Sequence, residues 1–240
     1  YPTDTVYGLG ANIFNNDAVE RIYEIKKRDQ SKPLSVLVQN TESLELIADL
    51  NRSSREIINK WLPGPFTFIL NKKNMVSPYV SASSKVGVRI PDYKIARALA
   101  SLFPITTTSA NLTNECTLSN PQDILKQIGN DIDLVIDVGD LGAAKPSTVI
   151  DLSSSKPTLV RNGFDYILHY GDKLWYNELF IFYALMIDPD ASPEIISDIY
   201  ERIKAQLPEQ DHEELDAIFG EIDGQLAGLG PATQVEFTKL

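Results

Sequence analysis

Three short segments of this chain carry side chains whose types and spacing suit the binding of a small anion. Residues 1–10 read Tyr-Pro-Thr-Asp-Thr-Val-Tyr-Gly-Leu-Gly and supply hydroxyls ahead of a glycine turn. Lys26 and Arg28 form a cationic pair, and Ser109 and Asn111 end a run of hydroxyl residues. A guanidinium binds phosphate through paired hydrogen bonds, whereas a lysine acts as a mobile point charge. Together the segments predict a site for a small polar substrate and a phosphate.

Each feature also has a purely structural interpretation. Cations in a last helical turn commonly complement the helix dipole, and Lys27 is expected to be a solvated example. Ser and Asn after a strand commonly form a turn, and a lone Arg in an apolar strand, such as Arg89, commonly reaches solvent. Four cations within residues 26–32, followed at once by a strand, favour the functional interpretation for Lys26 and Arg28.

The three segments, together with Val86-Gly-Val-Arg-Ile-Pro91, Pro146-Ser-Thr148 and Leu159-Val-Arg161-Asn-Gly163, resemble the ordered motifs of the YrdC/TsaC family. These proteins are the threonylcarbamoyl-adenylate (threonylcarbamoyl-AMP) synthases of tRNA modification. The resemblance covers residues 1–163, does not cover 164–240, and points to the short bacterial form, because Leu37 stands near where the long form often has a histidine. It implies a nucleotidyltransferase that joins L-threonine, bicarbonate and ATP, releasing pyrophosphate, for the t6A modification of tRNA.

The resemblance also assigns roles to the positions that match the family motifs. It places the catalytic function on Lys26, Arg28, Ser109 and Asn111. It places L-threonine against Thr5, Arg89, Ser109 and Ser147, with Arg89 on the carboxylate. It places ATP against Arg28, Lys32, Lys85, Asn111, Ser119 and Arg161.

Several absences limit the chemistry. His169 and His212 both lie beyond residue 163, Cys116 is the single cysteine, and the sequence has no Gly-x-x-x-x-Gly-Lys-Ser/Thr phosphate loop. The first 163 residues therefore cannot assemble a Ser/His/Asp triad, a cysteine–histidine pair or a zinc cluster. We expect catalysis to depend on positioning and charge stabilisation, with no protein metal site and with Mg²⁺ carried by ATP.

Charge is distributed unevenly along the chain. Residues 1–163 carry 18 Lys and Arg against 17 Asp and Glu, whereas residues 164–240 carry 4 against 16, within a total net charge of −11. An anionic substrate is therefore expected to approach the first part. The single cysteine suits a cytoplasmic protein, and no apolar run is long enough to span a membrane. The resemblance implies downstream t6A transferase proteins or tRNA as partners.

Short β-branched or aromatic runs bounded by Pro, Gly, Asn or Asp predict the strands. They are residues 1–6, 34–38, 66–70, 86–90, 105–108, 134–138, 148–152 and 158–161. Helices are expected at 18–27 after Asp17, at 54–62 after Ser53, at 95–103, and at 122–128 after Asn120 and Pro121. Alternating strands and helices indicate an α/β fold. The family resemblance adds a twisted mixed β-sheet flanked by helices around an open concave cavity.

Residues 164–240 are expected to form a small, acidic, mainly helical C-terminal appendage of unknown role. Its apolar residues repeat at helical spacing within 193–206 and 212–226. The appendage is either a partner-binding module or a solvated, fused segment. Family members usually carry a helix and the start of the first strand ahead of Tyr1, so we expect the native protein to begin earlier.

Two other functions remain open at this point. A double-stranded RNA-binding or ribosome-associated module could use the same basic cavity, and it would spread Lys, Arg and aromatic residues over one outer face. A carbamoyl-adenylating domain of a hydrogenase maturation protein would carry cysteine-rich zinc motifs and a second catalytic domain. The near-neutral charge of residues 1–163 and the clustering of their cations in motifs favour a small ligand.

Overall fold

The chain divides into two compact units in a computed structural model. One unit comprises residues 1–154 and 159–164, and the other comprises residues 155–158 and 165–240. The structure describes residues 1–129, 131–142, 145–154, 157–161, 163, 168–170 and 173–175, and positions 201, 204, 212 and 216. The predicted tail helices at 193–206 and 212–226 lie outside these residues except at the four single positions, which are helical. The second unit also contains the antiparallel strands β8 (Leu168–Tyr170) and β9 (Lys173–Trp175).

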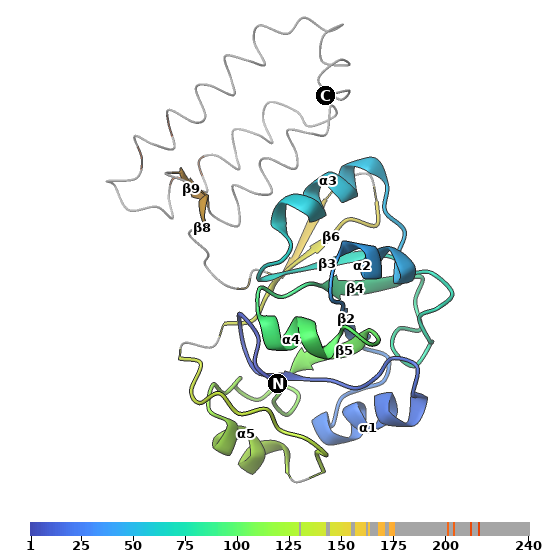
Figure 1. Cartoon of the computed structure of the whole chain (residues 1–240), viewed down its shortest axis with the longest axis vertical. Helices are drawn as coiled ribbons and strands as arrows, with labels where there is room; N and C mark the ends of the chain where they lie inside the picture. The colour runs from blue at the N-terminus through green and yellow to red at the C-terminus, as the bar shows by residue number, and fades with distance from the viewer. Residues whose placement is uncertain are drawn as a thin grey trace, which may run out of the picture. The chain divides into compact units, whose positions relative to one another are not determined.

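Seven strands of the first unit form one mixed sheet in the order β1-β5-β2-β4-β3-β6-β7 (Figure 1). Their bounds are β1 Gly8–Leu9, β2 Ser35–Leu37, β3 Phe66–Asn71, β4 Lys85–Arg89, β5 Ile105–Ser109, β6 Thr148–Asp151 and β7 Thr158–Arg161. Strand β2 runs parallel to β4, and β3 runs parallel to β6. The pairs β1–β5, β2–β5 and β3–β4 are antiparallel. The predicted mixed α/β sheet is therefore confirmed.

A row of directly opposed residues crosses the centre of this sheet and forms its rigid middle. The row runs through Thr106, Val36, Val88, Phe68 and Ile150. Each of these residues has none of its surface exposed. Four of the five are β-branched, a type that fits a pleated surface well and loses few rotamers there.

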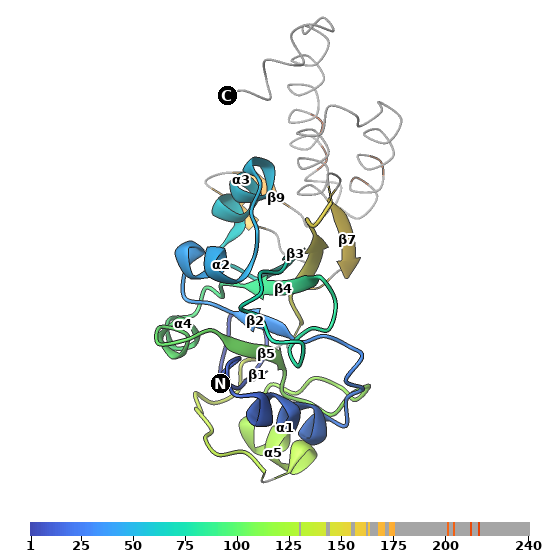
Figure 2. The same cartoon turned by 90° about the vertical axis from the view of Figure 1, so that its right-hand side faces the viewer.

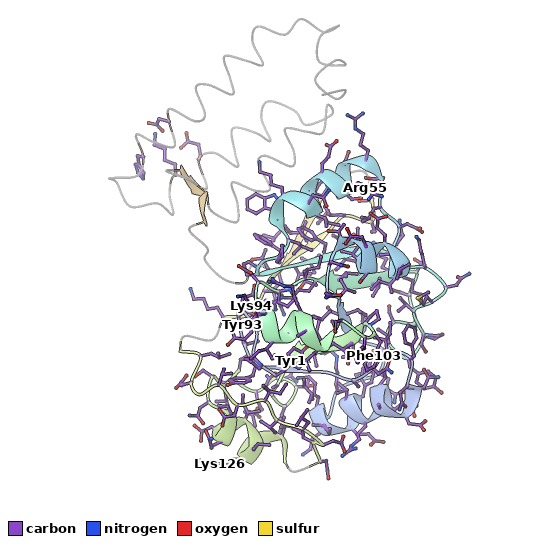
Figure 3. All side chains as sticks on the ribbon, in the orientation of Figure 1. Tyr1, Arg55, Tyr93, Lys94, Phe103 and Lys126 are labelled. Carbon is purple, nitrogen blue, oxygen red and sulfur yellow. The ribbon has the colours of Figure 1, made fainter. Side chains whose placement is uncertain are left out.

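Five helices surround the sheet. Their bounds are α1 Asn16–Lys26, α2 Thr41–Ile47, α3 Arg52–Trp61, α4 Lys94–Leu99 and α5 Pro121–Ile128. In Figure 2, α2, α3 and α4 lie to the left of the sheet, while α1 and α5 lie together below it, next to β5 and β1. Helix α4 packs through Ala96 and Ala100 on Leu37, with Tyr1 at the margin beside it (Figure 3). Within the described residues, no helix is long and apolar enough to cross a membrane.

Asparagine side chains begin four of these helices. Asn15, Asn40, Asn51 and Asn120 each accept a backbone N–H from the first turn that follows. The predicted cap at Asn120 is therefore confirmed, whereas the predicted caps at Asp17 and Ser53 are wrong by two residues. In each case an asparagine two residues earlier accepts the free amide of the first turn, so the helix begins ahead of the predicted cap. Helix α2 was not predicted.

Two predicted strands are absent. In the predicted strand 1–6, the Thr3 hydroxyl donates to the Val6 carbonyl at 2.6 Å and accepts the Val6 amide at 3.2 Å, so the backbone folds into a turn. Extended pairing begins only at Gly8. In the predicted strand 134–138, Leu134 is exposed and the Val138 amide donates to the Tyr7 hydroxyl rather than to a neighbouring strand. Apolar composition alone cannot show that a segment lacks a partner strand.

Candidate active site

A polar cavity of about 180 Å³ lies over the sheet in the first unit. Opposed residues on the strands provide its floor: Ser35 faces Thr107 across β2 and β5, and Thr67 faces Val149 across β3 and β6. All four side chains are small and three carry hydroxyls. The floor therefore leaves space above it and offers hydrogen bonds to a polar ligand.

Gly87 keeps the middle of the floor open. A Cβ atom at this position would lie 2.7 Å from the Ser35 Oγ and 3.3 Å from the Thr67 Cγ2. A side chain here would therefore displace the hydroxyl residues on both sides and reduce the depth of the cavity.

Three arginines line the cavity, and none of the described residues that line it is acidic. Arg89, at the end of β4, is 5% exposed. The Arg161 Nη2 donates to the Ser147 carbonyl at 2.8 Å and to its hydroxyl at 3.1 Å. Partial burial, and then the charge of Arg89, lower the pKa of Arg161. The third is Arg28, so the cavity concentrates positive charge and suits a ligand with more than one negative charge.

The end of α1 directs Arg28 to the cavity. Lys27 closes the helix in the left-handed conformation with a φ of 48°, and its amide and that of Arg28 return to carbonyls of the last turn. The Arg28 Nε then donates to the Lys32 carbonyl at 3.2 Å, and Nη2 donates to the Pro33 carbonyl at 3.0 Å. Lys27 itself is exposed, as the sequence predicted for a solvated residue.

Lys26 is buried, with 2% of its surface exposed, and does not line the cavity. Its Nζ donates to the Ser109 carbonyl at 2.5 Å and to the Asn111 carbonyl at 2.6 Å. The Ser109 hydroxyl in turn donates to the Asn111 Oδ1 at 2.5 Å. Lys26 therefore joins the end of α1 to the loop that follows β5. Burial, and secondly the charge of Arg28, lower the pKa of Lys26 to about 8.

This pKa predicts that anion binding at the cavity depends on pH. Lys26 is charged below pH 8 and loses its proton as the pH rises through that value, so its hydrogen bonds to the 109–111 loop and the positive potential both weaken. We expect a phosphate-bearing probe to bind about fivefold more weakly at pH 9 than at pH 7, measured by calorimetry. A Lys26→Met variant should bind weakly at both values and show no such step. An equal step in that variant would assign the titration to another group.

Ser147 connects two further elements of the site. Its hydroxyl forms a 2.8 Å hydrogen bond with the Thr67 hydroxyl, and its carbonyl accepts from Arg161. Gly163 packs directly over the Pro146 and Ser147 backbone, where a Cβ would overlap main-chain atoms, and its amide donates to the Thr148 hydroxyl at 3.2 Å. Pro146, Ser147 and Arg161 therefore line one side of the cavity, and Gly163 packs against the backbone behind them.

The structure brings some of the predicted site residues together and leaves others apart. Those that line the cavity are Arg28, Arg89, Ser109, Ser147 and Arg161. Lys26 and Asn111 are joined to Ser109 by hydrogen bonds, and the Thr5 hydroxyl is bonded to that of Thr3 at 3.1 Å. The lining does not include Lys32, Lys85 or Ser119. The Lys85 Nζ pairs with Asp151 at 2.9 Å, and the Ser119 side chain bonds to Asp140.

Sequence reasoning missed five hydroxyl residues of the cavity and one acidic residue behind it. The five that line the cavity are Thr3, Ser35, Thr67, Thr107 and Thr108. All but Thr3 lie on strands, where a hydroxyl residue is also common without a site. Asp4, whose side chain is 8% exposed, pairs with Arg89. Its signal was a carboxylate inside an otherwise apolar and hydroxyl-rich segment.

Known proteins are similar to this chain in sequence and in fold. The family model Sua5_yciO_yrdC, described as "Telomere recombination", matches residues 1–163. A protein of Methanocaldococcus jannaschii is 42% identical over 161 residues, which are 67% of this chain and 77% of that protein. Proteins named "Threonylcarbamoyl-AMP synthase" from Pyrococcus abyssi and Bacillus subtilis are 34% and 36% identical. The matched residues are 68% of this chain but 49% of each of those two proteins, so the chain spans about half their length.

Solved structures agree with the sequence comparisons. The crystal structure of P. abyssi Sua5 complexed with L-threonine superimposes with a TM-score of 0.64 at 34% identity, covering 68% of this chain and 49% of that one. The structure of E. coli YciO gives 0.63 at 32% identity, covering 68% of this chain and 81% of that one.

Proposed function

This chain belongs to the Sua5/YciO/YrdC family, and from that premise we propose that residues 1–163 form an L-threonylcarbamoyladenylate synthase. The proposed reaction joins L-threonine, bicarbonate and ATP to give threonylcarbamoyl-AMP and pyrophosphate, which makes the protein a nucleotidyltransferase. The observation that carries the proposal is the convergence of Arg28, Arg89 and Arg161 over a floor of hydroxyls with no carboxylate in the lining. Three guanidiniums suit one carboxylate and the phosphates of a nucleotide.

The amino acid and the nucleotide are proposed to occupy adjacent parts of this site, because Arg161 is hydrogen-bonded to Ser147. Arg89 binds the threonine carboxylate, while Ser109 and Ser147 meet the amine and the hydroxyl. Arg28 and Arg161 bind phosphate oxygens of ATP. Thr5 acts through its hydrogen bond to Thr3, which lines the cavity. The cavity of about 180 Å³ is too small to hold both threonine and a whole nucleotide. Part of ATP is therefore proposed to lie outside it, in contact with Lys32, Lys85 and Ser119.

The chemistry requires positioning more than a protein nucleophile. The threonine amine attacks the carbon of bicarbonate, and loss of water gives the carbamate. A carbamate oxygen then attacks the α-phosphorus, a new P–O bond forms, and the bond to the β-phosphate breaks to release pyrophosphate. The guanidiniums stabilise the negative charge that develops on the phosphates. Mg²⁺ is proposed to enter with ATP as part of the substrate and to neutralise charge on the phosphates.

The RNA-binding alternative is not favoured. A module of that kind gathers cations and aromatic residues on one outer face. Figure 3 shows Arg55 on α3, Lys94 at the start of α4 and Lys126 on α5, spread from one end of the first unit to the other. A cytoplasmic location and an association with t6A transferase proteins or tRNA follow from the proposed reaction. Residues 164–240 are proposed as a separate appendage outside the chemistry.

Incubation with ATP, bicarbonate and L-threonine tests the proposal, because it should release pyrophosphate and form the adenylate. Serine lacks one methyl group and should react about tenfold more slowly. Valine lacks the hydroxyl and should be about a hundredfold slower or worse, because the site hydroxyls then lose their partner. Pyrophosphate release that is independent of the amino acid, or equal for all three, would refute the proposal.

A further inference from the structure

Asp4 lies behind the cavity and contacts it only through Arg89. One of its carboxylate oxygens pairs with the Arg89 Nη2, and the other accepts the Asp92 amide at 3.0 Å. The side chains of Asp4 and Arg89 are 8% and 6% exposed. Asp4 is absent from the lining, whereas Arg89 is part of it. The carboxylate is therefore fixed at both oxygens and presents Arg89 to the cavity.

The contact leaves most of the guanidinium available. A guanidinium has five N–H donors, and Asp4 accepts a hydrogen bond from Nη2 only. The Nε of Arg89 is buried and has no hydrogen-bond partner among the described residues. An unsatisfied buried donor on a charged group is unfavourable, and an anion bound beside Arg89 can supply the missing acceptor.

Asp4 also distinguishes Arg89 from the other two arginines. Arg28 and Arg161 donate to backbone carbonyls and one hydroxyl, and in the part of the chain that the structure describes no carboxylate pairs with either. Arg89 and Arg161 line the same cavity, so their like charges repel each other. The Asp4 carboxylate offsets this repulsion at Arg89, because a paired counter-charge lowers the cost of burying a guanidinium.

We propose that Asp4 is a positioning residue that holds the Arg89 guanidinium in place for the carboxylate of L-threonine. The proposal deepens, and rests on, the function proposed above. The Asp4–Arg89 pair has little net charge and suits a singly charged carboxylate, whereas the unpaired Arg28 and Arg161 suit phosphates. Asp4 therefore sets the affinity for the amino acid and not that for the nucleotide.

The Asp4→Asn variant tests this role. Its amide can still accept one hydrogen bond but no longer holds the guanidinium by charge, so the dissociation constant for L-threonine should rise about tenfold. The dissociation constant for ATP should change by less than about twofold, which also shows that the variant is folded. Asp92→Asn is the matched control, because its side chain is exposed and its backbone amide still holds Asp4. It should bind both ligands like the wild type.

A second comparison separates positioning from general stability. In an Arg89→Ala background, Asp4→Asn should cause no further loss of threonine affinity, or even a gain, because the unpaired Asp4 then repels the carboxylate. An equal loss in both backgrounds, or unchanged threonine affinity in Asp4→Asn alone, would overturn the proposal. If Asp4→Asn does not fold, Asp4→Glu replaces it in the same comparison. Glutamate keeps the negative charge, but its longer side chain displaces the Arg89 guanidinium. Failure of the wild type to bind threonine and release pyrophosphate would instead refute the proposed function.

Discussion

The Arg89→Ala variant is expected to lose about a hundredfold in affinity for L-threonine, close to 3 kcal/mol, with little change for ATP. The guanidinium is 5% exposed and lines the cavity, so its removal deletes a desolvated, charge-assisted contact to the carboxylate. It also leaves the Asp4 carboxylate without its partner, next to the place that the substrate carboxylate would occupy. Both effects act against threonine.

The conservative change Arg89→Lys refines this prediction. An ammonium cannot contact Asp4 and the threonine carboxylate at once through the planar geometry of a guanidinium. It keeps the positive charge, however, so the expected loss of threonine affinity is smaller than for Arg89→Ala, about tenfold. The measurement is the KM for threonine at saturating ATP, together with the dissociation constant for ATP alone. A variant that loses ATP and threonine affinity equally would place Arg89 in the nucleotide part of the site.

The second large effect is expected for Lys26→Met, which should reduce kcat/KM for ATP by roughly thirtyfold, or about 2 kcal/mol. Methionine fills similar space but leaves the Ser109 and Asn111 carbonyls without their donor. The loop after β5 is then free to move, and the positive potential at the end of α1 falls. Turnover measured over a range of ATP concentrations reports the loss.

Lys27→Met is the matched control for this change. It removes the same charge one residue later, from an exposed side chain, and keeps a residue type that tolerates the left-handed helix end about as well. Its kcat/KM should remain within about twofold of the wild type. Equal effects at the two positions would show that the net charge of the helix end matters, rather than the hydrogen bonds of Lys26.

The sequence could predict the motifs of the site because they combine unusual residue types at short range. Arg28 stands in a cluster of four cations, whereas the resemblance to the family assigns Arg89 and Arg161, and all three line the cavity. The floor could not be predicted, because Ser35 and Thr107 become neighbours only through the antiparallel pairing of β2 with β5. The pairing register between two strands that are distant in the sequence leaves no local signal in either strand.

The same distinction explains the errors in the fold. The run at 134–138 has strand-like composition, but strand formation depends on a partner, and the Val138 amide bonds to the Tyr7 hydroxyl instead. The segment 1–6 has strand-like composition too, but the Thr3 hydroxyl competes for its backbone amides. Composition shows which secondary structure a segment favours. The hydrogen-bond partner that prevents strand formation lies elsewhere in the chain in the first case (Tyr7) and in one side chain of the segment in the second (Thr3).

The cavity receives Thr3 from the first residues of the chain and Arg161 from its seventh strand, and this has a consequence for folding. Strand β5 inserts between β1 and β2, so the sheet closes through contacts between distant parts of the sequence. Such contacts form late, because long loops must be ordered before they are stabilised. During synthesis, a nascent chain that ends before β7 contains Ser147 but lacks Arg161, whose hydrogen bonds to Ser147 complete that side of the cavity. We therefore expect the cavity to form only after β7 has been synthesised.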